Sequence, residues 1–151
     1  MHPVVPTIIP SYVYSLFAAL VVGSIIIYAC NASVSGIRND ANTQVLQNID
    51  QYVAAQSLNL LAHTTETGQN TTQYLEVPAN LGGQRFWVQI GKDASSAWVK
   101  SGFGTEVFAS QTRVSIPADV VASGTYVSGS GRPYLQCSLQ GEVFTLTLTS
   151  G

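Results

Sequence analysis

Side chains that could bind a metal or perform catalysis are few and scattered in this sequence. His2 and His63 are the only histidines, and no Cys, Asp or Glu residues surround them at the spacing of metal ligands. Catalysis of the Ser-His-Asp type would have to use His63, which no nucleophile-elbow motif accompanies. The Asp and Glu residues form no recognisable acid–base pair, and the glycines lie in turn-like segments rather than in a phosphate-binding loop. We therefore predict that the chain is not an enzyme and holds no cofactor or metal.

Two thiols, Cys30 and Cys137, leave two alternatives open. Outside the cell they could form a disulfide that joins the N-terminal segment to the C-terminal half. Such a bridge would restrict the unfolded chain by about 4–5 kcal/mol in the entropic account of disulfide stabilisation. Alternatively, they remain two buried free thiols.

Two segments match the acceptor motif for N-glycosylation, Asn31-Ala32-Ser33 and Asn70-Thr71-Thr72. Asn70 lies among polar, turn-forming residues and is the better predicted acceptor, whereas Asn31 falls in a predicted helix. Four aromatic residues of the C-terminal half could form an adhesive surface, or else pack in a core or at subunit contacts: Trp87, Trp98, Phe103 and Tyr126.

The element that must position these groups is an apolar stretch near the N-terminus. Residues 12–29 contain no charged side chain, and none occurs before Arg38. As a helix that begins near Pro10, or that begins earlier and is kinked at Pro10, this run could cross a hydrocarbon core of roughly 30 Å. It lacks the Lys and Arg flanks of a signal peptide or a resident membrane protein. That absence is what remains when a basic leader is removed just before an apolar segment, although Met1 could equally be the start codon.

Beyond residue 33 the pattern becomes one-sided, with apolar residues every three to five positions. The predicted stripe that packs this part on the rest of the chain includes Val34, Ile37, Ala41, Val45, Ile49 and Tyr52. No proline interrupts the stretch, so we predict one helix within residues 1–62. Its first part is surrounded by lipid or by copies of itself, and its second part rests on a folded domain.

A polar junction at residues 63–72 separates this helix from residues 73–151, where apolar residues alternate with polar ones. The clearest predicted strands are Phe86–Ile90, Arg113–Ile116, Leu135–Leu139 and Phe144–Leu148. Weaker ones are predicted near Leu75–Val77, Ala97–Val99, Thr105–Ala109 and Ala122–Val127. Short strands at about ten-residue spacing predict an antiparallel β-sandwich or barrel. The predicted fold class is therefore α+β, with one long N-terminal helix followed by an antiparallel β-sandwich.

Composition limits the function further. Only 9% of residues are charged and the net charge is −2, so the composition does not predict a basic surface that would bind nucleic acid. A surface of uncharged hydroxyls and amides favours an extracellular location, with glycosylation as an option.

An uncharged apolar N-terminus, a helix of about 50 residues and a Ser/Thr-rich all-β region together resemble the type IV pilin superfamily. The low charge makes the chain more similar to archaeal members, the adhesion pilins and archaellins, than to bacterial pilins. Bacterial pilins carry a glutamate at the fifth mature position, where this chain has Val5, and archaeal members generally lack it.

The resemblance implies a subunit of an extracellular helical filament for adhesion, or as an archaellin for motility. It also implies processing by a prepilin-type peptidase, insertion in the membrane before assembly, and an assembly ATPase with its platform. Head-to-tail contacts that do not close would generate the homopolymer. The expected filament core helix contains Tyr12, Leu16, Phe17, Leu20, Val21, Gly23, Ser24, Ile25, Ile27 and Tyr28. The alternative is a membrane-anchored β-sandwich that serves as a binding or accessory module of the cell envelope.

Overall fold

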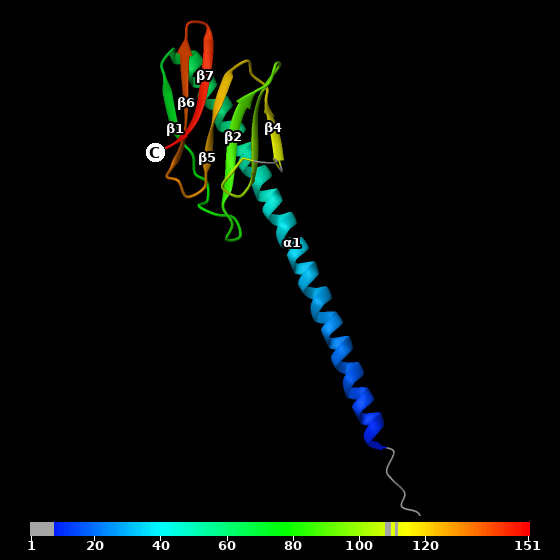
Figure 1. Cartoon of the computed structure of the whole chain (residues 1–151). Helices are drawn as coiled ribbons and strands as arrows, with labels where there is room; N and C mark the ends of the chain where they lie inside the picture. Colours follow the sequence, from blue (N-terminus) through cyan, green and yellow to red (C-terminus); the bar gives the residue numbers. More distant parts are fainter. Residues whose placement is uncertain (1–7, 108–109, 111) are drawn as a thin grey trace, which may run out of the picture. The chain divides into compact units, whose positions relative to one another are not determined.

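The computed structural model describes residues 8–107, 110 and 112–151 (Figure 1). A single long helix, α1 (Ile8–Thr67), precedes seven strands. The strands are β1 (Thr71–Tyr74), β2 (Phe86–Lys92), β3 (Ala97–Phe103), β4 (Thr112–Ile116), β5 (Val121–Val127), β6 (Pro133–Gln140) and β7 (Val143–Ser150). The chain divides into two units, residues 1–40 and residues 41–151. We call the second unit the head.

The described part of α1 begins at Ile8, so Pro10 lies in the first turn. A proline is tolerated there because the first backbone N–H groups of a helix have no partner within the helix. Val5, the residue at the position of the bacterial glutamate, lies outside the described residues.

The helix ends at Thr67, five residues beyond the predicted end at Ala62. The threonines of the expected junction continue the helix, and their hydroxyls donate to carbonyls four residues earlier: Thr64 to Leu60, Thr65 to Leu61 and Thr67 to His63. Gly68 then stops it. Its φ is 66°, and its N–H donates to the Thr64 carbonyl at 2.9 Å, as in a helix C-cap.

All seven strands belong to one sheet in the order β1-β6-β7-β5-β2-β3-β4. Every pairing is antiparallel except that between β5 and β7. The predicted α+β class, with a long helix followed by a mostly antiparallel, sandwich-like β region, is confirmed. In detail the sheet is a single open one, and the layer that faces it is the part of α1 that belongs to the head.

The four clearest predicted strands are found as β2, β4, β6 and β7, and two of the weaker ones as β3 and β5. The strand expected at Leu75–Val77 is wrong, because β1 lies just before it and Leu75 instead packs in the core. No strand is found at residues 105–107, while Phe108 and Ala109 lie outside the described residues.

The core lies between the sheet and residues 46–64 of α1. Its fully buried side chains include Leu46 and Val53 from the helix, Phe86 from β2, and Leu135 and Leu146 from β6 and β7. Burial of this apolar surface, at about 25 cal/mol per Å², holds the helix against the sheet.

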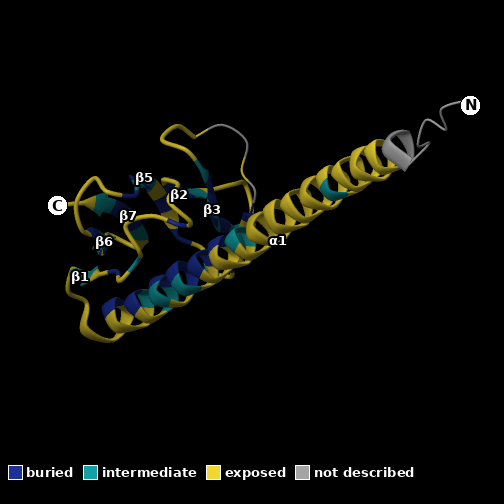
Figure 2. Ribbon diagram, turned by 90° about the horizontal axis from the view of Figure 1, so that it is seen from below, coloured by how far each residue is buried: buried dark blue, intermediate teal, exposed yellow. Residues whose placement is uncertain are grey.

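The face of α1 that packs on the sheet differs from the predicted stripe (Figure 2). Of the predicted residues, Ile49 is buried and Tyr52 half-buried, but Val34, Ile37, Ala41 and Val45 are exposed. The buried positions are Leu46, Ile49, Asp50, Val53, Ala54, Ser57, Leu60 and Thr64. At about 100° per residue this face is rotated by roughly a third of a turn from the predicted one. The sequence pattern predicted the wrong packing face because only apolar residues were counted, whereas the face that packs on the sheet also includes the polar residues Asp50, Ser57 and Thr64.

Candidate functional surfaces

The candidate functional surface of the first unit is the apolar segment, defined here as residues 12–37 of α1. Nearly all of its side chains are exposed, Tyr28 to 78% and Phe17 to 66%. Of the residues expected in the filament core helix, Gly23 is half-buried and all the others are exposed. By length and composition this helix could cross a membrane, and none of its apolar stretch is buried.

Two serine hydroxyls within the apolar segment are satisfied by the helix itself. Ser24 donates to the carbonyl of Leu20 at 2.8 Å, and Ser35 to the carbonyl of Asn31 at 3.0 Å. A hydroxyl paired in this way does not need water, so these serines suit an apolar environment. Gly23 and Gly36 leave open space where a side chain would stand, so another helix can approach the backbone closely there.

Both thiols are free, and the disulfide that the sequence left open is not formed. Cys30 is exposed on α1, whereas Cys137 is fully buried in β6. The alternative of two buried thiols is right for Cys137 alone. Cys137 alternates with outward-facing residues of β6, so the sheet pleat directs its sulfur into the core.

The two acceptor motifs lie in different settings. Asn70 is exposed in the short connection between α1 and β1, whereas Asn31 is exposed on the helix. Of the four aromatics considered for an adhesive surface, Trp87 and Tyr126 are buried, and Trp98 and Phe103 are half-buried. Core packing therefore explains most of them.

Trp98 is the centre of a charged cluster on the surface of β2, β3 and β4. The Lys100 ammonium lies 4.2 Å from the centre of the Trp98 ring, and the indole N–H donates to the Asp93 carboxylate at 3.0 Å. Asp93 also pairs with Arg113. This hydrogen bond from Arg113 is the main reason that the pKa of Asp93 lies below its ordinary value.

Sequence reasoning missed a buried carboxylate at the contact between α1 and the sheet. Asp50 is fully buried, and one of its oxygens, Oδ2, accepts a hydrogen bond from the Thr112 hydroxyl. The hydroxyls of Ser101 and Thr112 lie 2.6 Å apart and share a further hydrogen bond. The other carboxylate oxygen, Oδ1, has no hydrogen-bond partner among the residues that the structure describes. Burial raises the pKa of Asp50, and the hydrogen bonds from the two hydroxyls oppose this shift only in part.

A signal for Asp50 was present in the sequence. Asp50 lies on the same helical face as Leu46, Ile49 and Val53, so the spacing of these apolar residues already indicated that their face includes a carboxylate.

Among residues 8–107, 110 and 112–151, no group of His, Cys, Asp or Glu could hold a metal ion. His63 lies exposed on α1.

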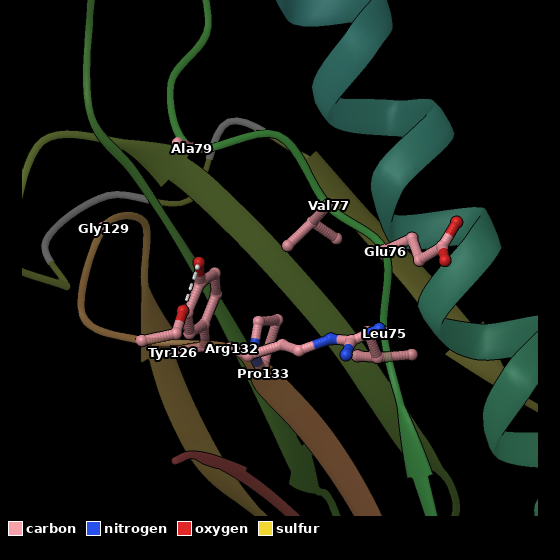
Figure 3. Close-up of a pocket in the computed structure, with 9 residues that line it drawn as sticks. Leu75, Glu76, Val77, Ala79, Tyr126, Gly129, Arg132 and Pro133 are labelled. Carbon is pink, nitrogen blue, oxygen red and sulfur yellow. Dashed lines mark hydrogen bonds between the residues drawn. The ribbon is translucent and has the colours of Figure 1, made fainter.

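An open hollow of about 560 Å³ lies at one end of the head, between the chain after β1 and the turn before β6 (Figure 3). Leu75, Val77 and Pro133 contribute apolar walls, and Arg132 contributes a cation. The guanidinium of Arg132 lies 5.0 Å from the centre of the Tyr74 ring, which holds it at the edge of β1. The Glu76 carboxylate also borders the hollow but points towards α1.

Comparisons with protein-family models, with curated proteins and with solved structures found no match to this chain.

Proposed function

We propose that the chain is a structural, non-enzymatic subunit of an extracellular type IV pilus-like helical filament. In this proposal the apolar segment passes from the membrane into a filament core built from identical segments, and the heads form the outer surface. The observation that carries the proposal is the apolar segment, whose side chains are exposed although the head has a complete core of its own.

The chemistry of the apolar segment favours association with copies of itself. A charge buried without a partner costs several kcal/mol. The apolar segment has no charged side chain to bury, because the first one in the sequence is Arg38. Moving from lipid to a bundle of helices gains little hydrophobic energy, so close packing at small residues such as Gly23 and Gly36 would set the register. The resemblance to archaeal adhesion pilins supports adhesion as the role of the filament.

A specific observation also favours a second candidate, a membrane-anchored module of the cell envelope. The helix is long and apolar enough to cross a bilayer by itself. This candidate places the apolar segment permanently in lipid, with the head as a binding or accessory domain.

Lysine substitution at Val22 or Ile26 tests the filament. Either Val22→Lys or Ile26→Lys places an unpaired ammonium in the core, and we expect no filaments in negative-stain micrographs of material sheared from the native host. Val22→Leu is the matched control, because it keeps the position apolar, and it should assemble. Thermal unfolding of the head should be the same in all three variants.

Intact filaments from either lysine variant would overturn this proposal. Wild-type protein that remains a detergent-solubilised monomer, on a host without polymers, would instead support the membrane-anchored module.

A further inference from the structure

The two ends of the head carry different chemistry. The strand pairs Pro133–Ser150 and Tyr74–Tyr134 lie at the end with the hollow, which we call the hollow pole. The turn between β6 and β7 lies at the opposite end, which we call the turn pole (Figure 1). β6 runs from the hollow pole to the turn pole, with Arg132 immediately before it and Glu142 two residues after it.

The turn pole ends in a small tip. Gln140 and Val143 are paired, and only Gly141 and Glu142 connect them. Gly141 has a φ of 68°, a conformation that glycine adopts without strain and that closes the tight turn. The tip presents a carboxylate on Glu142 next to an apolar side chain, Val143, which is 52% exposed. In the described part of the chain, Glu142 makes no ion pair.

The hollow pole offers the complementary groups. Its apolar walls surround an open space, and Arg132 has no carboxylate partner among the described residues. Glu76 and Glu106 lie at this end of the head, as does Gly151, whose backbone pairs with that of Arg132 at 3.1 Å in each direction, and no carboxylate forms an ion pair with Arg132 among the described residues. Glu76 points towards α1 (Figure 3), and Glu106 follows β3, four strands from β6 in the sheet order and so roughly 19 Å away at about 4.8 Å per strand.

If the chain assembles into the proposed filament, on which this inference rests, we infer that the tip of one head, Gln140–Val143, docks in the hollow of the next copy. Glu142 then pairs with Arg132 of that copy, and Val143 lies against its apolar walls. All subunits of a polar filament have the same direction along its axis, so each contact joins two different surfaces of the chain. The hollow pole offers a cation beside apolar walls, and the turn pole offers a carboxylate beside an exposed apolar side chain; neither charge forms an ion pair in the described part of the chain.

Charge exchange tests this contact on filaments of the native host. Glu142→Arg and Arg132→Glu each place like charges together, and we expect each to lower the amount of sedimentable filament protein about tenfold or more. The double variant exchanges the two charges and should restore assembly towards the wild-type level. Glu106→Arg is the matched control, because it reverses another exposed carboxylate, and it should assemble normally.

Salt provides a second measurement that a merely structural role of these residues would not affect. Exposed charges are screened at high ionic strength. The loss of sedimentable filament protein in each single variant should therefore be smaller at about 0.5 M NaCl than at about 0.05 M, while the amount from Glu106→Arg should equal that of the wild type at both. Wild-type filaments with single variants that assemble normally would overturn the contact and leave the proposed filament standing. A double variant no better than the single ones would also overturn it. Absence of wild-type filaments would remove both proposals.

Discussion

Replacing Asp50 by Asn should stabilise the head at neutral pH. Asp50 is fully buried, and in the described part of the chain one of its oxygens has no hydrogen-bond partner, while the other oxygen's neighbours are the hydroxyls of Thr112 and Ser101 rather than a cation. A buried charged group that lacks partners costs about 1–3 kcal/mol or more. Asparagine fills almost the same volume and can still accept the hydrogen bond from Thr112, but it carries no charge.

At pH 7 we therefore expect Asp50→Asn to raise the free energy of unfolding by about 1–3 kcal/mol. For a domain the size of the head, at roughly 4 °C per kcal/mol, this corresponds to a Tm increase of about 4–12 °C. The measurement is thermal unfolding of the full chain in neutral detergent, followed by circular dichroism between pH 3 and pH 8.

The advantage of the variant should depend on pH with a definite sign. A native pKa of Asp50 above the ordinary 3.8 means that the folded state binds the proton more tightly than the unfolded state. The stability that protonation provides is complete below pH 3.8 and is lost as the pH rises through the raised native pKa. The wild type should therefore match Asp50→Asn in acid and fall below it at neutral pH.

Asp40→Asn is the matched control, since Asp40 lies exposed on the same helix, and its stability should follow the wild type at every pH. The pKa values of Asp93 and Asp119 are lowered by Arg113 and Lys92, and shift stability in the opposite direction. Both carboxylates are retained in every variant, so their effect cancels. Asp50→Asn less stable than wild type at pH 7, or offset from it equally at all pH values, would refute the reasoning.

Three further predictions concern single positions. Gly124→Ala should destabilise the head by about 3 kcal/mol or more, measured by denaturant unfolding, because φ is 130° there and a Cβ would lie 2.2 Å from the Leu148 carbonyl oxygen; an unchanged midpoint would contradict this close approach. In protein unfolded without reductant, maleimide should label both Cys30 and Cys137, because both thiols are free; labelling of neither would indicate a disulfide. Asn70→Gln should lower the mass of the protein from its native host by one glycan, and an unchanged mass would exclude glycosylation at that site.

Much of the fold could be predicted from the sequence, because local periodicity carries it. The three-to-five-residue spacing after Val34 and the alternation in Phe144–Leu148 each belong to one kind of element and need no knowledge of distant residues. The candidate surfaces divide in the same way. The apolar segment was predicted because it consists of consecutive residues, whereas the hollow joins residues near 75 to residues near 132 and left no local signal.

The sequence by itself therefore determined that a long helix, whose first part carries no charged side chain, precedes a β region of low charge. Only the tertiary structure decided which face of that helix packs on the sheet, because Asp50, Ser57 and Thr64 are polar by type and buried by position. Tertiary structure also decided that β5 and β7 pair in parallel and that the two thiols are free. These features depend on contacts between residues far apart in the chain, and no local pattern of residue types encodes such contacts.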